Sequence, residues 1–188
     1  MRDALANREC FAAPFGVIET ERLDLRPLEL GDAPWLARES SRPEIARMTG
    51  RIPSPNPPLF VESFILTMRA AEQCRGDHVR LIIDRRDGDR IGVVGLNPHG
   101  GGVWELGYWL SREKWGHGYA TEASHGLLEY AKEHGITCFQ AGYFLENPAS
   151  GRVLEKLGFA DTGRRSEVFS IGRMAASAHA DMVLHMDA

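Results

Sequence analysis

The chain has 188 residues, a formal net charge of −4, and hydrophobic (43%) and charged (26%) fractions that are ordinary for a globular domain. This length predicts a single domain, placed here over residues 16–188, with an N-terminal extension over residues 1–15. No apolar run reaches the roughly 18 residues of a membrane span and no signal-peptide pattern is present, so we expect a cytoplasmic protein that does not enter a membrane. The negative charge argues against a nucleic-acid partner and favours basic acceptors such as amines.

Three cysteines, Cys10, Cys74 and Cys138, are odd in number and lack the spacing of metal ligands, which favours a reducing compartment. Cys138 falls in an apolar run, so we expect a buried small hydrophobe rather than a nucleophile. The seven histidines include no His-Glu-x-x-His motif. The sequence therefore predicts no metal site.

The first third of the chain predicts a strand, a short helix, a loop and a longer helix. Residues 17–26 alternate in polarity and predict a strand that Pro27 ends. Asp32 or a neighbour is expected to cap a short helix running through residue 40. Residues 51–58 carry four prolines and predict a loop. A helix over residues 59–73 follows, with these residues expected on one face: Phe60, Phe64, Ile65 and Met68.

The next segments predict antiparallel strands. Residues 79–84 and 91–96 flank an Asp-Gly-Asp turn, which is a hairpin pattern. The glycines at 100–102 predict a second hairpin tip before a strand over residues 103–110. Side chains alternate along a strand, so one face is expected to hold Trp104, Leu106 and Tyr108, and the other Glu105, Gly107 and Trp109.

The last third predicts two helices and three further strands. Residues 119–134 predict a helix that Gly135 stops, with an apolar stripe of Ala120, Ala123, Leu127 and Ala131. A strand is expected over residues 136–144. Asn147 is expected to cap a helix that starts at Pro148, ends before Gly158 and buries Ala149, Val153 and Leu157.

Two more β segments are expected near residues 168–171 and 181–186, joined by a loop rich in Gly, Ala and Ser. Helices and strands are therefore mixed along the chain. This order predicts an α+β fold, a three-layer sandwich built around one sheet.

The segment from Trp115 to Ala123 reads Trp-Gly-His-Gly-Tyr-Ala-Thr-Glu-Ala and directly follows a predicted strand end. Gly116 and Gly118 permit a tight turn that brings several backbone N–H groups to one point. The following helix adds its unpaired N–H groups and positive dipole end, which makes a phosphate cradle. The two common nucleotide-binding fingerprints are absent. A plain strand-to-helix connection is the alternative.

Three segments together resemble the GNAT superfamily of N-acetyltransferases, in its RimJ/RimL-like branch of ribosomal-protein N-terminal acetyltransferases. They are Glu105-Leu-Gly-Tyr-Trp-Leu with the glycine loop at 116–123, Thr20-Glu-Arg-Leu-Asp-Leu-Arg-Pro-Leu, and the run Asn147-Pro-Ala-Ser-Gly-Arg-Val-Leu-Glu-Lys-Leu-Gly-Phe. The similarity covers about residues 18–186. It implies a GNAT-type α/β/α sandwich around a mixed, mostly antiparallel sheet with a splayed central strand pair. The loop at 51–58 then becomes a candidate lid over the acceptor, with a plain connector as the alternative.

The resemblance also implies a binding site for acetyl-CoA without a metal. Its implied cofactor-binding positions are Trp109, Leu110, Ser111, Gly116, His117, Gly118, Tyr119, Ala120, Thr121, Asn147 and Ser150. Trp115 departs from the superfamily, which usually has Gln or Arg there, so Arg112, Lys114 or His117 would supply any side-chain contact to the pyrophosphate. Asn147 would touch the pantetheine arm while also capping its helix. For the 3′-phosphate the candidates are Arg152, Arg164, Arg165 and Arg173, each of which has simple surface exposure as its alternative.

Two residues are candidates for proton transfer. Glu105 matches a strand position at which superfamily members place the base that deprotonates the amine, and a solvent-facing or Arg-paired glutamate is the alternative. Ser150 matches the serine that protonates the departing thiolate in the RimJ/RimL-like branch, because Leu154 stands where other members have Tyr. Glu122 is expected to be a first-turn acid favoured by the helix dipole. The acceptor tunnel has four aromatic candidates for its walls, Trp104, Tyr108, Trp109 and Phe144, with core packing as the alternative.

The sequence therefore predicts an acetyl-CoA-dependent N-acetyltransferase that transfers its acyl group by direct attack of a primary amine, on a protein N-terminus or a small molecule. A non-catalytic acyl-CoA-binding regulatory domain is the alternative, and a protein–protein interaction domain is a third possibility. A homodimer is compatible with the N-terminal extension.

Overall fold

The computed structural model describes residues 16–74 and 76–187. The expectations for the extension at 1–15, including Cys10, lie outside the described residues. The described residues form one sheet in the order β1-β2-β3-β4-β5-β6-β8-β7. The strands are β1 Ile18–Glu19, β2 Leu23–Pro27, β3 His78–Asp84, β4 Arg90–Gly100, β5 Val103–Leu110, β6 Cys138–Phe144, β7 Ala160–Ser170 and β8 Ala175–His185.

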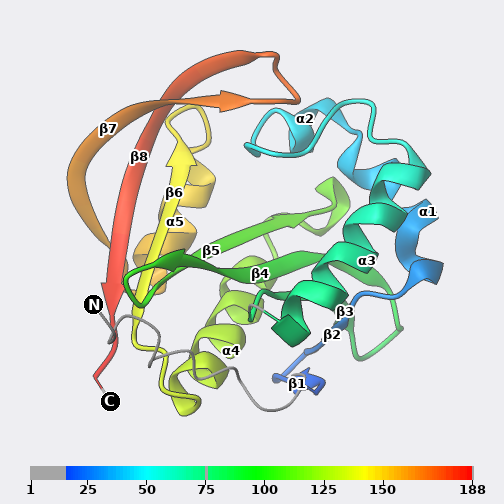
Figure 1. Ribbon diagram of the computed structural model, residues 1–188, viewed down its shortest axis with the longest axis horizontal. Helices are drawn as coiled ribbons and strands as arrows, with labels where there is room; N and C mark the ends of the chain where they lie inside the picture. The colour runs from blue at the N-terminus through cyan, green and yellow to red at the C-terminus, as the bar shows by residue number, and fades with distance from the viewer. Residues whose placement is uncertain (1–15, 75, 188) are drawn as a thin grey trace, which may run out of the picture.

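The middle of the sheet is splayed. Neighbouring strands are antiparallel except β5 and β6, which run parallel and pair only at Trp104 with Phe139 and Glu105 with Gln140. Beyond Glu105 the two strands diverge, as Figure 1 shows. The predicted mixed, mostly antiparallel sheet with a splayed central pair is confirmed.

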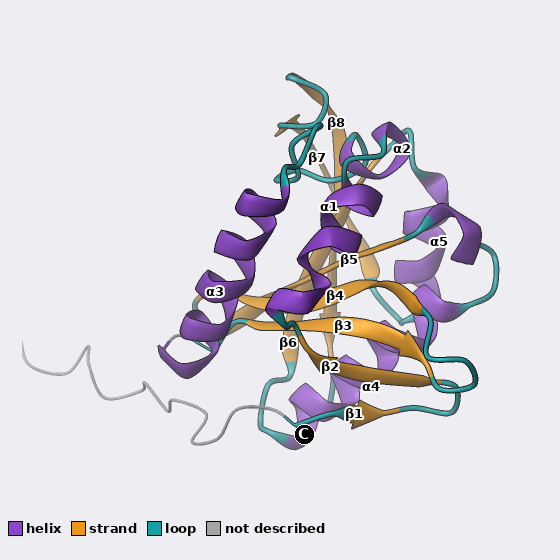
Figure 2. Ribbon diagram, turned by 90° about the vertical axis from the view of Figure 1, so that its right-hand side faces the viewer, coloured by secondary structure: helices purple, strands orange, loops and turns teal. Residues whose placement is uncertain are grey.

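Helices cover both faces of the sheet (Figure 2). They are α1 Ala33–Ser40, α2 Pro43–Ala46, α3 Pro58–Cys74, α4 Tyr119–Glu133 and α5 Pro148–Lys156, with 3-10 turns η1 Leu30–Asp32 and η2 Arg112–Lys114. One apolar core joins the sheet to α4 and α5 and includes Leu106, Leu127 and Leu154. The other joins it to α1 and α3 through residues such as Leu36 and Ile65. This arrangement is the predicted three-layer sandwich. No described helix has both the length and the apolar character that crossing a membrane requires.

The N-terminal strand expected over residues 17–26 is wrong in one respect, because the chain reverses within it. The Thr20 N–H donates to the Leu23 carbonyl at 2.8 Å, which closes a turn between β1 and β2. Asp32 precedes α1 as predicted, but its side chain makes no cap hydrogen bond to that helix. Its buried carboxylate accepts instead from Arg26 and Arg90.

Two predicted helix faces, on α3 and α5, are rotated relative to the structure, whereas the α4 face is largely confirmed. On α3, Phe60 and Phe64 are 60% and 43% exposed, because the helix rests on α1 and β3 through Val61 and Ile65. On α5, Gly151 and Leu154 are buried while Ala149 is exposed and Val153 and Leu157 are half-buried. On α4, Ala123, Leu127 and Ala131 are buried as predicted, whereas Ala120 is half-buried.

Two further expectations needed correction. Cys138 is half-buried rather than buried. The Gly/Ala/Ser-rich segment is mostly strand, because residues 175–180 pair with β7, and only a short turn separates β7 from β8. Small residues in this segment therefore lie in a long two-stranded arm at the edge of the sheet (Figure 1).

Candidate functional site

The glycine loop lies between the end of β5 and the start of α4. Gly116 and Gly118 have φ values of 79° and 80°, in the left-handed region that favours glycine, and Gly118 is the N-cap of α4. Within the described part of the chain, no hydrogen bond uses the N–H groups of residues 116–121. These six N–H groups belong to the loop and the first turn of α4, and the dipole at a helix N-terminus favours an anion. The predicted tight turn and helix start are present, and phosphate binding by this loop stays a prediction.

The side chains near this loop are engaged elsewhere. The Trp115 indole N–H donates to the Leu110 carbonyl at 2.9 Å, which ties the loop back to the end of β5. Lys114 pairs with Asp89 at 2.7 Å, and Arg112 lies 3.7 Å from Glu44. Both side chains therefore have carboxylate partners within the protein, and their contact with the pyrophosphate stays a prediction. The loop offers backbone N–H groups as its principal anion-binding groups.

Ser111 is buried, and both its N–H and its hydroxyl donate to the Ile91 carbonyl, at 2.9 and 3.2 Å. The Ser111 N–H is therefore bonded within the protein, and a role for Ser111 in cofactor binding stays a prediction. The prediction that Trp109 and Leu110 line the pantetheine arm stays a prediction.

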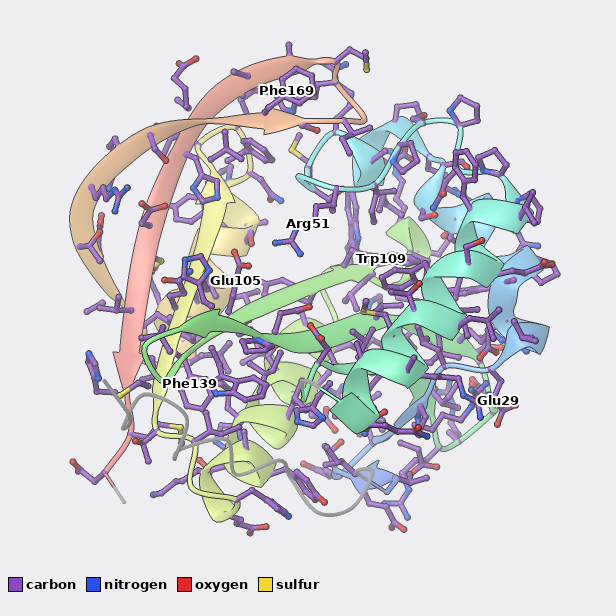
Figure 3. The ribbon with its side chains drawn as sticks, in the orientation of Figure 1. Glu29, Arg51, Glu105, Trp109, Phe139 and Phe169 are labelled. Carbon is purple, nitrogen blue, oxygen red and sulfur yellow. The ribbon has the colours of Figure 1, made fainter. Side chains whose placement is uncertain are left out.

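Glu105 is the last residue of β5 that pairs with β6, where these two strands begin to separate. Its side chain is 38% exposed, and the Arg51 guanidinium is 3.4 Å from its carboxylate. Figure 3 shows Arg51 extending toward Glu105 from the loop that precedes α3. This contact brings the proline-rich loop over the face of β5 that carries Glu105. The carboxylate is thus both accessible and held near a cation.

Trp109 shares the Glu105 face of β5 and stacks on Trp35 of α1, with ring centroids 6.0 Å apart. Trp104 and Tyr108 pack instead against the core on the α4 side. The predicted alternation of faces along β5 is confirmed. Phe144 is buried next to the His179 ring, so it belongs to the core rather than to an open wall.

Asn147 caps α5 as predicted, because its side-chain oxygen accepts the Ser150 N–H at 3.2 Å. The Ser150 hydroxyl lies 2.8 Å from the Tyr108 hydroxyl, which can also donate to the Ser150 carbonyl at 3.1 Å. Burial raises the pKa of Tyr108 to about 12 against the opposing effect of its hydrogen bond to Ser150. A neutral phenol therefore holds Ser150 across the gap between β5 and α5.

The sequence did not single out Tyr108 as the partner of Ser150. Face alternation already placed Tyr108 opposite Glu105, on the side that α5 covers, and this was the available signal. Leu154, where other superfamily members place Tyr, is a fully buried core residue at 1% exposure. No hydroxyl from that position competes with Ser150.

Three of the four arginines considered for the 3′-phosphate have carboxylate partners. Arg165 pairs with Asp161, Arg164 with Asp181 and Arg173 with Glu146. Glu122, which was expected as a first-turn acid, accepts hydrogen bonds from the Thr20 hydroxyl and the Arg22 guanidinium. These bonds connect α4 to the turn between β1 and β2.

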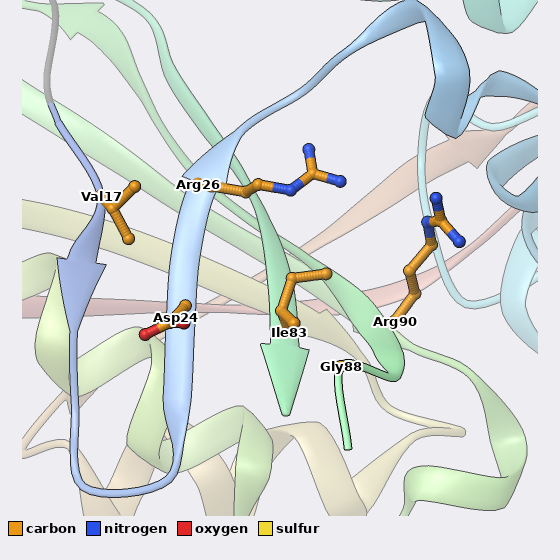
Figure 4. Close-up of a pocket in the computed structure, with 6 residues that line it drawn as sticks. All are labelled: Val17, Asp24, Arg26, Ile83, Gly88 and Arg90. Atoms are coloured by element: carbon orange, nitrogen blue, oxygen red, sulfur yellow. The ribbon is translucent and has the colours of Figure 1, made fainter. Parts of the chain in front are cut away.

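A separate hollow of about 280 Å³ lies over β2–β4 and is lined by Val17, Asp24, Arg26, Ile83, Gly88 and Arg90 (Figure 4). It contains none of the predicted site residues, and its two arginines bind Asp32. Among the described residues, no group of three or more His, Cys, Asp or Glu side chains is placed to hold a metal ion.

Comparison with known proteins identifies the family that the sequence motifs resemble. Residues 22–160 match the family model described as an acetyltransferase (GNAT) domain. The chain is 31% identical over 156 residues to the uncharacterized N-acetyltransferase YoaA of Bacillus subtilis, covering 79% of this chain and 85% of that protein. It is 29% identical over 147 residues to the uncharacterized N-acetyltransferase p20 of Bacillus licheniformis, covering 77% and 82%.

A solved structure has the same fold. The ribosomal L7/L12 α-N-protein acetyltransferase RimL, determined in complex with coenzyme A, superposes with a TM-score of 0.80. The match covers 91% of this chain and 98% of that chain at 16% identity.

Proposed function

The chain belongs to the GNAT acetyltransferase family and is an acetyl-CoA-dependent acyltransferase, and from this premise we propose that it acetylates a primary amine by direct attack in a ternary complex. The acceptor class is an amine at a peptide N-terminus or on a small molecule. The observation that carries the proposal is the set of unpaired N–H groups at residues 116–121, which lies at the end of the strand that diverges from β6.

The cradle fits a diphosphate through its backbone. Loop amides and the positive end of α4 would stabilise negative charge, while the Arg112 and Lys114 side chains pair with carboxylates. From this anchor the pantetheine arm would run into the gap between β5 and β6. There Trp109 and Leu110 lie along one strand, while Asn147 and Ser150 lie at the start of α5. Acetyl-CoA supplies an activated acyl group as a thioester.

Glu105 is proposed as the proton acceptor. An ammonium group has no lone pair, so the acceptor amine must lose a proton before its nitrogen attacks the thioester carbon. The exposed carboxylate of Glu105 can take that proton directly or through water. Held in one complex, the two reactants also gain from proximity.

Ser150 is proposed to protonate the sulfur when the tetrahedral intermediate collapses and the carbon–sulfur bond breaks. The products are an amide and free coenzyme A. The Tyr108 hydroxyl holds Ser150 in place and remains neutral at physiological pH, since its pKa is about 12. Glu105 and Tyr108 face opposite sides of β5, so the proton acceptor and the proton donor approach the gap from its two faces.

Three measurements test this function. Calorimetry with coenzyme A should register binding, and thiol release from acetyl-CoA should accelerate with at least one member of a panel of peptides, polyamines and aminoglycosides. Mass spectrometry of the acceptor should find one added acetyl group on nitrogen. Absence of binding at millimolar coenzyme A would refute the proposal, and binding without turnover would leave a regulatory acyl-CoA-binding domain.

A further inference from the structure

We propose that Arg22, in the turn between β1 and β2, is a positioning residue that holds the glycine loop in its diphosphate-binding conformation. This inference rests on the proposed function, because it takes the N–H groups at 116–121 as the diphosphate site. Arg22 connects two parts of the chain that are 100 residues apart in sequence. It contacts both the loop and the first turn of α4.

The first half of the connection is the carboxylate of Glu122. This carboxylate accepts hydrogen bonds from the Arg22 N–H, Arg22 Nε and the Thr20 hydroxyl, each at 2.7 Å. Burial opposes ionisation of Glu122, but these hydrogen bonds from Thr20 and Arg22 outweigh it and lower the pKa of the carboxyl group. Glu122 therefore remains charged at neutral pH and fixes both the backbone and the guanidinium of Arg22.

The second half is the loop itself. Arg22 Nη1 donates to the His117 carbonyl at 3.1 Å. In a trans peptide the carbonyl and the following N–H point in opposite directions. The contact therefore turns the Gly118 N–H away from Arg22. It also occupies the His117 carbonyl, which lies four residues before Thr121 and could otherwise accept the Thr121 N–H in a helical hydrogen bond.

Tyr119 connects the same guanidinium to the sheet. The Arg22 guanidinium lies 4.7 Å from the centre of the Tyr119 ring, and the Tyr119 hydroxyl donates to Asp84 at 3.1 Å. The turn also lies directly on α4, since a Cβ at Gly126 would come within 2.6 Å of Thr20. The hairpin turn and the loop thus form one connected unit.

The effect of Arg22 is geometric rather than electrostatic. Its charge is balanced by Glu122 at 2.6 Å, so the pair adds little net field at the loop. A lysine at this position would keep the charge, but its compact ammonium lacks the planar fork that serves a carboxylate and a carbonyl together. Charge and geometry can therefore be separated by substitution.

The experiment measures coenzyme A affinity by calorimetry, and KM and kcat with acetyl-CoA, for the wild type, Arg22→Met, Arg22→Lys and Arg85→Met. Arg85 is the matched control, because it donates to the Thr20 carbonyl and pairs with Glu19 but does not touch the loop. Thermal unfolding is recorded for each variant. We expect both Arg22 variants to bind coenzyme A about tenfold more weakly and to raise KM more than they lower kcat. Arg85→Met should keep the wild-type affinity.

Two results would overturn the inference while leaving the proposed function in place. One is equal loss of affinity in Arg22→Met and Arg85→Met, which would mean that only the stability of the hairpin matters. The other is wild-type affinity in Arg22→Lys, which would mean that charge alone suffices. If Arg22→Met does not fold, Glu122→Gln is measured in its place. This substitution removes the carboxylate charge that balances and fixes the Arg22 guanidinium. Weaker coenzyme A binding by that variant supports positioning, and tighter binding contradicts it. Failure of the wild type to bind coenzyme A would instead reject the proposed function.

Discussion

Replacing Glu105 by Gln removes the proposed proton acceptor while keeping the size of the side chain. General base catalysis contributes about 10²- to 10⁴-fold in rate. Because 38% of the Glu105 side chain is exposed, water can accept the proton of the amine in part of the turnovers when the carboxylate is absent. We therefore expect the lower end of that range, a loss of about 100-fold in kcat, or about 2.7 kcal/mol in the barrier.

The fold should tolerate this change. The ion pair that Glu105 makes with Arg51 is exposed at both ends, 81% and 38%, and such pairs contribute at most about 1 kcal/mol. The melting temperature and coenzyme A affinity should therefore change little.

The assay is thiol release from acetyl-CoA at saturating acceptor, followed between about pH 6 and pH 10. Turnover by Glu105→Gln should recover partly at high pH, where the free amine is neutral without help. Arg51→Gln is the matched control, since it breaks the same ion pair but keeps the carboxylate, and its kcat should remain well above that of Glu105→Gln. A kcat within about threefold of wild type, with an unchanged pH–rate profile, would refute the assignment of Glu105 as base.

Other predictions concern the loop, α5 and acid stability. Gly118→Val should abolish coenzyme A binding in calorimetry and cost about 1–2 kcal/mol of stability, because φ at this position is 80°. Asn147→Ala should lower the free energy of unfolding in urea by about 1 kcal/mol through loss of the α5 cap. Tyr108→Phe should lower kcat about tenfold. The double variant with Ser150→Ala should lose less activity than the product of the two single losses. Multiplicative losses would argue against the coupling of Tyr108 and Ser150. Burial opposes ionisation of Glu72, but hydrogen bonds from His78 and Arg80 bring its pKa to about 2 from 4.5. The ionised Glu72 therefore contributes at most about 3 kcal/mol to the free energy of unfolding above pH 4.5, and this contribution is lost as the pH falls toward 2. In acid titrations, the stability of Glu72→Gln should lack this pH dependence.

Local patterns in the sequence were sufficient for most of the fold. Turn glycines, alternating polarity along β5 and the Asn147 cap act over a few residues, and the structure confirms each of them. Faces of helices were less predictable, because packing against other elements decides them. The α3 prediction grouped Phe60 and Phe64 with Ile65, whereas the stripe that contacts α1 and β3 is centred on Val61 and Ile65.

Pairing between distant segments was the part that local reasoning missed. Arg22 and Glu122 are each unremarkable in their own segments, and only the fold brings the β1–β2 turn onto α4. The same holds for the 2.8 Å contact between Tyr108 and Ser150, which joins a strand to a helix 42 residues later. Sequence patterns identify which groups can perform chemistry, whereas tertiary contacts determine which of them are held in place.

Trp115 stands where the resemblance implies Gln or Arg, and its contact differs from the one that either side chain would make with a diphosphate. Its indole N–H occupies the Leu110 carbonyl at one end of the connection, and Arg22 occupies the His117 carbonyl near the other end. A carbonyl directed into the loop would repel a diphosphate, so contacts that hold carbonyls toward other donors favour an anion in the remaining space. Trp115→Phe should remove the first contact alone and weaken coenzyme A binding in calorimetry. If Trp115→Phe binds as tightly as the wild type, the Trp115 contact only packs the loop, and the conformation of the cradle depends on its glycines and on Arg22.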